Sequence, residues 1–203
     1  PFAYRYYFNV VTYVYTMPYW DEDRWDKELD WMALRGVDMP LFLLAQEIIY
    51  RRVFLSMGLT AKDIDAWEGG PAHLPWFRMG NLAGNSFDGP LGQNWHNRQK
   101  ALAKAVLKRM GELGMKPVVP AFGGFVPKAY AEKLGSGNYV ASGWGWMPQA
   151  YRNYRITPAR SEFKEIGKNF IERWDAEFED SYGSFQYYLS DSFHEMDVPS
   201  DLN

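Results

Sequence analysis

The hydrophobic and polar positions of this 203-residue chain change period several times, and each change marks an expected element. Four runs rich in aromatic, β-branched or other apolar residues are typical of strands, and they span residues 4–16, 37–45, 115–122 and 185–189. Between them, apolar residues recur at the spacing of an amphipathic helix. The long helices are expected over residues 21–36, 47–57, 97–113 and 161–180, with shorter ones over 60–67 and 127–134.

The alternation of strands and helices predicts an α/β fold with a parallel sheet and helical crossovers. Both a doubly wound sheet and a (β/α)8 barrel have this order. No G-x-G-x-x-G or Walker-type loop follows any expected strand, which favours the TIM-barrel type. Since only four strands are expected, residues 1–203 would supply about the first four strand–helix units of one barrel domain.

Two long loops interrupt this pattern, over residues 69–92 and 135–159. Both are rich in glycine, and loops of this length in a compact domain are usually functional or disordered. The first carries Trp76 and Met79, whose large apolar side chains argue against disorder, and the second carries Trp144.

Composition narrows the classes of function. The net charge is −3, with 22 basic and 25 acidic residues well mixed, so we expect no nucleic-acid partner. No apolar run reaches the roughly 18 residues of a membrane span. The chain has no cysteine and its three histidines share no ligand spacing, so we expect neither a metal nor a cofactor. Aromatic residues make up 18% of the chain; most should be core, and a minority should stack on sugar rings.

Polar side chains follow the ends of the expected strands, where barrel enzymes place their active sites. After the fourth strand come Asp191, His194 and Glu195. A sugar-cleaving barrel needs a general acid there, together with a second carboxylate that comes from another strand. Asp191 is therefore a poor partner for Glu195, and a merely solvated glutamate remains the alternative. Gln46 and Glu47, after the second strand, either orient the site or pair with Arg51 or Arg52.

Several longer strings carry a family resemblance. They are RYYFNVVT (5–12), WDKELDWMALRGVDMPL (25–41), QEIIYRRVFLSMGLT (46–60), GPAHLPWFRMGNL (70–82), DGPL with WH (88–96), GMKPVVPAFGGFVP (114–127) and SFHEM (192–196). In this order and spacing they resemble the α-N-acetylglucosaminidases, glycoside hydrolase family 89. The match covers nearly the whole chain, so it is more specific than any single motif.

The resemblance implies a retaining exo-glycosidase that releases terminal α-linked N-acetylglucosamine from heparan sulfate-like or mucin-type glycans. It places the general acid/base on Glu195. His194, where many barrel glycosidases have asparagine, would contact a sugar hydroxyl. The other residues that would line the sugar pocket are Asn9, Tyr15, Trp76, Met79 and Trp144.

The resemblance also implies parts beyond this chain. The nucleophile glutamate and a helical C-terminal domain would lie after Asn203, so we expect the 203-residue chain alone to be inactive. The family's setting favours an exported bacterial protein, or a lysosomal one in an animal. Two alternatives remain open from the sequence: a barrel glycosidase with another sugar specificity, and a carbohydrate-binding segment without catalysis.

Overall fold

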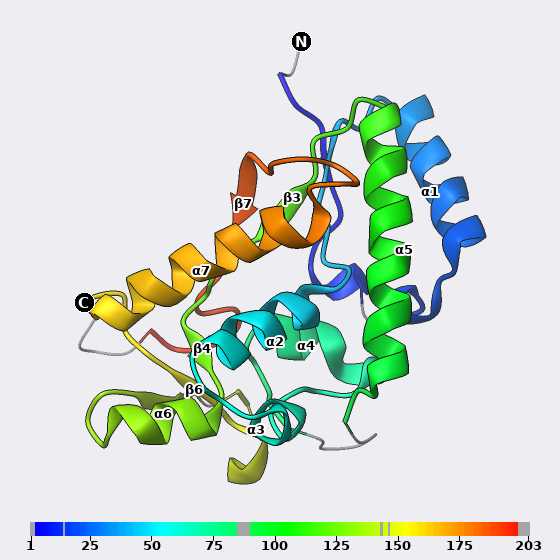
Figure 1. The fold of residues 1–203 in the computed structure, drawn as a ribbon. Coiled ribbons are helices and arrows are strands. Elements are labelled where there is room, and N and C mark those ends of the chain that lie inside the picture. The colour runs from blue at the N-terminus through cyan, green and yellow to red at the C-terminus, as the bar shows by residue number, and fades with distance from the viewer. Residues whose placement is uncertain (1–2, 14, 85–89, 143, 146, 199–203) are drawn as a thin grey trace.

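The computed structural model describes residues 3–13, 15–84, 90–142, 144–145 and 147–198 (Figure 1). Its α-helices are α1 (Glu22–Leu34), α2 (Gln46–Ser56), α3 (Ala61–Asp65), α4 (Leu74–Arg78), α5 (Gln93–Glu112), α6 (Lys128–Leu134) and α7 (Ser161–Phe178). Its strands are β1 (Tyr6–Tyr7), β2 (Met39–Pro40), β3 (Val118–Pro120), β4 (Phe125–Val126), β5 (Val140–Ser142), β6 (Asn153–Arg155) and β7 (Tyr187–Leu189). Short 3-10 turns are η1 (Val11–Tyr13), η2 (Met17–Tyr19), η3 (Pro71–His73) and η4 (Gln149–Tyr151).

Strands β1, β2, β3 and β7 follow one another as parallel neighbours. β1 pairs with β2, a parallel bridge joins Leu41 to Val118, and β3 pairs with β7 with Val118 opposite Tyr187. Helices α1, α5 and α7 lie in the crossovers between these strands. This order is that of a TIM-barrel-type domain, so the predicted α/β class and the parallel pairing are confirmed.

The crossover helices form where their sequences predict them. In α1, the Asp21 side chain accepts a hydrogen bond from the Arg24 N–H, which caps the first turn. Its buried residues Trp25, Leu29 and Met32 recur at helical spacing, and α1 packs against α5, which lies beside it (Figure 1). In the part of the chain that the structure describes, no helix is both long enough and apolar enough to span a bilayer.

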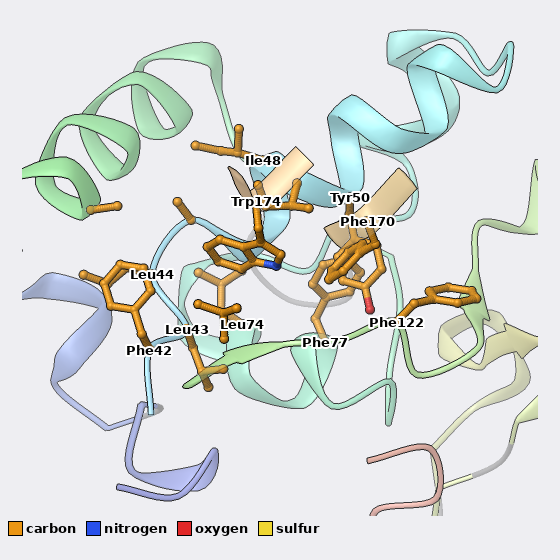
Figure 2. Packing of buried hydrophobic residues seen from close by; sticks show 14 of the residues in the cluster. Phe42, Leu43, Leu44, Ile48, Tyr50, Leu74, Phe77, Phe122, Phe170 and Trp174 are labelled. Atoms are coloured by element: carbon orange, nitrogen blue, oxygen red, sulfur yellow. The ribbon is translucent and has the colours of Figure 1, made fainter. Parts of the chain in front are cut away.

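A single hydrophobic core joins the strands to the helices. Figure 2 shows Phe42, Tyr50 and Phe77 close to Phe170 and Trp174 of α7, which packs against α2. Burial of these rings removes large apolar areas from water and stabilises the contact. As expected, many of the aromatic side chains are core.

The first strand is much shorter than expected. Residues 4–16 have strand composition, but β1 ends at Tyr7 because Phe8 adopts a left-handed backbone with φ 73°. The Asn9 carboxamide then accepts a hydrogen bond from the Thr12 N–H (2.9 Å), and the Thr12 hydroxyl donates to the Asn9 carbonyl (2.7 Å). These local bonds replace ladder pairing and start η1, so composition alone gave the wrong length.

The two long loops contain regular structure that the sequence did not predict. The first holds η3 and α4, and α5 begins at Gln93 rather than at residue 97. The second contributes β5 and β6, which join β4 in an antiparallel sheet of order β4-β6-β5. These strands have three residues each and mix polar with apolar side chains, so their pattern is too short to show a period. We call residues 69–92 the first insertion and residues 135–159 the second insertion. They come after the parallel strands β2 and β3 respectively.

Candidate active site

The carboxyl ends of the four parallel strands converge on a small cavity of about 30 Å³. Each strand supplies a nearby lining residue: Val10, Leu43, Ala121 and Asp191. A cavity of this size holds about two water molecules and no sugar ring. A ligand larger than that would have to lie above the cavity, where the two insertions reach the end of β7.

Glu195 lies beyond the end of β7, with its side chain 62% exposed. The Trp144 indole N–H donates to Glu195 Oε2 at 3.2 Å, and His194 Nε2 lies 4.0 Å from Glu195 Oε1. His194 Nδ1 is 2.9 Å from an Asp191 carboxylate oxygen. Because an ionised carboxylate only accepts, Nδ1 carries the hydrogen in that bond and Nε2 turns toward Glu195. One carboxylate is thus exposed between an indole and an oriented imidazole.

Two tryptophans from different insertions form an aromatic pair beside this carboxylate. The ring centroids of Trp76, in α4, and Trp144, after β5, lie 6.1 Å apart at an interplanar angle of 33°. The His73 ring lies 6.1 Å from Trp76 on the same insertion. Both indoles are partly buried, which leaves ring surface open to a ligand. Such rings offer flat apolar area together with indole donors.

The structure brings together four of the seven residues that the sequence singled out: Trp76, Trp144, His194 and Glu195. Met79 is buried and lines the small cavity beneath them. Asn9 directly precedes Val10, which lines the same cavity, and a place for Asn9 and Tyr15 in the site stays a prediction. The Asn9 side chain is used in its own turn, and Tyr15 is 73% exposed.

Two residues that the sequence reasoning missed hold the chain around Glu195. We call residues 191–196 the Glu195 segment. The Asn81 carboxamide donates to the His194 carbonyl at 2.8 Å, and Asn81 is fully buried. Arg155 donates to the Ser192 carbonyl at 3.2 Å and lies 4.2 Å from the centroid of the Phe193 ring. Only the resemblance, whose string 70–82 contains Asn81, carried a signal for either residue.

Backbone strain gathers at the same end of the barrel. Among the described residues, the non-glycine positions with positive φ are Phe8 (73°), Ala45 (65°) and Glu195 (51°). They follow β1, β2 and β7 respectively. A side chain in the left-handed region costs about 1–3 kcal/mol, so the surrounding contacts must hold these turns in place.

A buried ion pair supports the first insertion. Arg78 donates to Glu47 at 2.8 Å, and their side chains are 2% and 0% exposed. Gln46 donates its side-chain amide to the Arg78 carbonyl at 3.3 Å. Of the two alternatives for Glu47, pairing with Arg51 or Arg52 does not occur, because those arginines contact other carboxylates. The pair instead joins the start of α2 to the end of α4, beneath Met79.

A second buried carboxylate, Glu68, accepts a hydrogen bond from His96 Nε2 at 3.1 Å. Burial raises the pKa of Glu68 above its ordinary value, and the His96 bond opposes part of that rise. His96 is therefore a structural partner of Glu68. Within the described ranges, no group of three or more histidine or carboxylate side chains is placed to hold a metal ion.

Gly80 is expected to tolerate no side chain. Its φ is +80°, and an added Cβ would lie 2.1–2.2 Å from atoms of the Phe125 ring. Gly80→Ala should therefore destabilise the protein by about 1–3 kcal/mol through overpacking. Gly167→Ala is the matched control, because Gly167 lies inside α7 with nothing within 4 Å of an added Cβ. Gly167→Ala should stabilise the protein by about 0.5–1 kcal/mol, so the melting temperature should fall for Gly80→Ala and rise for Gly167→Ala.

Fold and site together define a TIM-barrel-type domain whose carboxyl-end face carries an exposed glutamate beside paired tryptophans. The family model described as the α-N-acetylglucosaminidase (NAGLU) TIM-barrel domain matches residues 5–203. The chain belongs to this family, which confirms the resemblance seen in the sequence.

Individual relatives agree with this assignment. The chain is 41% identical over 202 residues to human α-N-acetylglucosaminidase, covering 98% of this chain and 26% of the human protein. A family 89 glycoside hydrolase from Clostridium perfringens, solved with 2-acetamido-1,2-dideoxynojirmycin, matches with a TM-score of 0.87 at 30% identity. That match covers 99% of this chain and 22% of the bacterial chain.

A second structure of the Clostridium perfringens enzyme shows it with two glutamates replaced by glutamine, in complex with its substrate GlcNAc-α-1,4-galactose. It matches with a TM-score of 0.87 at 29% identity, over 99% of this chain and 22% of that one. The chain described here therefore spans about a quarter of the length of these relatives.

Proposed function

We propose that this chain is part of a retaining exo-glycosidase that releases terminal α-linked N-acetylglucosamine, with Glu195 as general acid/base. The observation that carries the proposal is the Glu195 carboxylate, exposed at the end of the last parallel strand and contacted by Trp144. In barrel enzymes this end of the strands carries the catalytic groups. The family and the names of its relatives supply the sugar.

The reaction needs two carboxyl groups about 5–5.5 Å apart. In the first step Glu195 gives its proton to the glycosidic oxygen, while a nucleophilic carboxylate attacks the anomeric carbon and displaces the leaving alcohol. In the second step Glu195 takes a proton from water, whose oxygen attacks the anomeric carbon and releases the nucleophile. The two inversions leave the sugar in its original α configuration.

The nucleophile is proposed to lie outside these 203 residues, in the part of the barrel that follows. Residues 1–203 would then form about the first four strand–helix units, and the chain alone would not hydrolyse a glycan. Two facts support this: the chain spans 22% of the bacterial relative, and the substrate complex of that relative carries two glutamate substitutions. The second is what a mechanism with two carboxylates requires, and the first leaves room for the other carboxylate.

The substrate is proposed to be a glycan chain of heparan sulfate-like or mucin type that ends in α-linked N-acetylglucosamine. The paired rings of Trp76 and Trp144 offer an apolar surface for one face of the sugar. His194 Nε2, directed toward Glu195, would bond a sugar hydroxyl. A barrel glycosidase for another sugar would use the same surface, and only the relatives favour N-acetylglucosamine.

The proposal is tested by following hydrolysis of GlcNAc-α-1,4-galactose by the full-length enzyme with proton NMR. We expect N-acetylglucosamine to appear first as the α anomer, before mutarotation, while the matched α-glucoside and α-N-acetylgalactosaminide are left uncleaved. Release of the β anomer first would contradict the retaining mechanism. Cleavage of only another sugar would favour the second specificity, and binding without any cleavage would favour a carbohydrate-binding role.

A further inference from the structure

The orientation of Glu195 depends on specific contacts rather than on regular structure. β7 ends at Leu189, and the described part of the Glu195 segment continues in turns and bends with φ 51° at Glu195 itself. No helix or strand ladder fixes such a backbone, and the left-handed region is unfavourable for a side chain. The Met196 N–H donates to the Phe193 carbonyl at 3.0 Å and closes a turn, but the central peptide of such a turn, which here joins His194 to Glu195, can take either of two orientations. A contact on that peptide from outside the segment can select one of them.

Asn81 contacts that peptide directly. Its side-chain amide donates to the carbonyl oxygen of His194 at 2.8 Å. This oxygen belongs to the planar peptide group that joins His194 to Glu195. Fixing the carbonyl fixes the plane, and therefore the direction in which the Glu195 Cα and side chain leave it.

Asn81 is itself rigidly held. It is fully buried, and its backbone N–H donates to the Trp76 carbonyl at 2.9 Å. It follows Gly80, against which the Phe125 ring lies too closely for any side chain. The same residue thus joins the turn that carries Trp76 to the peptide that carries Glu195.

The other side-chain bonds on the Glu195 segment do not reach this peptide. Trp144 bonds the Glu195 side chain, and the Ser142 hydroxyl lies 2.9 Å from Met196 Sδ, on the residue after Glu195. Arg155 donates to the Ser192 carbonyl, three residues before Glu195, and its guanidinium faces the Phe193 ring. Rotations at the intervening residues can absorb a change there. Among the described residues, the Asn81 bond is therefore the one that sets the peptide plane next to the acid.

We propose that Asn81 is a positioning residue that aims the Glu195 carboxyl at the glycosidic oxygen. The inference rests on the proposed function, because it gives Asn81 a role through the general acid. Without the Asn81 donor the His194 carbonyl turns, the strained backbone at Glu195 relaxes, and the proton is delivered from the wrong position. The sugar platform of Trp76 and Trp144 keeps its ring contact.

The test uses the full-length enzyme and two substrates, GlcNAc-α-1,4-galactose with a poor leaving group and an aryl α-N-acetylglucosaminide with a good one. The readout is the ratio of kcat/KM for the aryl substrate to kcat/KM for the disaccharide. A good leaving group needs little protonation, so loss of acid catalysis raises this ratio. Loss of folded enzyme lowers both values equally and leaves the ratio unchanged.

Asn81→Leu, which keeps a similar size but no donor, and Asn81→Ala are both expected to raise the ratio about tenfold, as misplacement of a catalytic group does. The matched control is Asn153→Ala, which removes another fully buried carboxamide, one that accepts from Trp67 at 2.8 Å and does not touch the Glu195 segment. It should lower stability and leave the ratio within about twofold of wild type, since general acid catalysis is intact.

Glu195→Gln provides the reference for loss of the acid. If Glu195→Gln raises the ratio and both Asn81 variants leave it unchanged, the positioning role is wrong while the proposed function stands. A ratio that Asn153→Ala raises as much as the Asn81 variants do would also overturn the inference, because any buried amide would then have the same effect. If Glu195→Gln leaves the ratio unchanged, the acid assignment fails and the inference fails with it.

Discussion

Glu195→Gln in the full-length enzyme is expected to lower kcat/KM for GlcNAc-α-1,4-galactose by at least about 100-fold, the typical contribution of a general acid. An aryl α-N-acetylglucosaminide with a good leaving group should keep most of its rate of glycosylation, because its phenolate departs without a proton. Glutamine preserves the size of the side chain and an oxygen that can accept the Trp144 indole bond. The loss therefore reports on the missing proton rather than on altered packing.

Asp197→Asn is the matched control for this prediction. Asp197 is an exposed carboxylate two positions from Glu195, so the substitution removes one nearby negative charge and leaves the acid in place. Its kinetic constants should stay within about twofold of wild type, since an exposed charge exerts a weak, screened effect. An equal loss on both substrates for Glu195→Gln would show that Glu195 binds the sugar rather than protonating it.

Arg78→Met is expected to cause the largest loss of stability among single substitutions in the first insertion. The Glu47 carboxylate would remain fully buried without its partner, and breaking such a pair costs about 3–5 kcal/mol. The melting temperature of the enzyme should fall on the order of 10 °C, measured by differential scanning calorimetry. Met79 and α4 should lose order first, because the pair anchors α4 to α2.

The double variant Arg78→Met with Glu47→Leu separates the charge from the packing. Replacing a buried ion pair by apolar side chains of similar volume is often neutral or stabilising, so most of the lost melting temperature should return. Recovery of less than half would mean that the hydrogen bonds of the pair, and not the stranded charge, hold the insertion.

Periodicity predicted the helices well because the buried side chains of each helix recur at helical spacing in its own sequence. In α7, Ile166, Phe170, Trp174 and Phe178 recur every four residues and all are fully buried. The strands were harder to predict, since composition says nothing of where a ladder ends. Residues 4–16 have the aromatic and β-branched content of a strand, and a single left-handed residue, Phe8, ends β1 after Tyr7.

In the candidate site, too, some features were predictable from the sequence and others were not. The resemblance singled out Trp76, Trp144, His194 and Glu195, and contacts between the insertions bring these residues together. Pairings over long separations had no local signal. The sequence offered only Arg51 and Arg52, which share its helix, as ionic partners of Glu47, yet its partner Arg78 lies 31 positions away.

Asn81 shows the limit most clearly. Its partner is a backbone carbonyl 113 positions further along the chain. Every residue of the chain has a backbone carbonyl, so no pattern of residue types identifies the one that is bonded. Only the folded structure shows which peptide a buried carboxamide holds.

The left-handed turns after β1, β2 and β7 also bear on how this enzyme can be made more robust. Glycine at any of these positions would relax the backbone, and at Glu195 it would remove the proposed acid in the same step. A laboratory selection for heat resistance alone would favour such changes, because stabilising substitutions are often found at positions where function keeps a protein below its maximal stability. Thermostability engineering of this family should therefore exclude the carboxyl-end turns and screen every candidate for turnover.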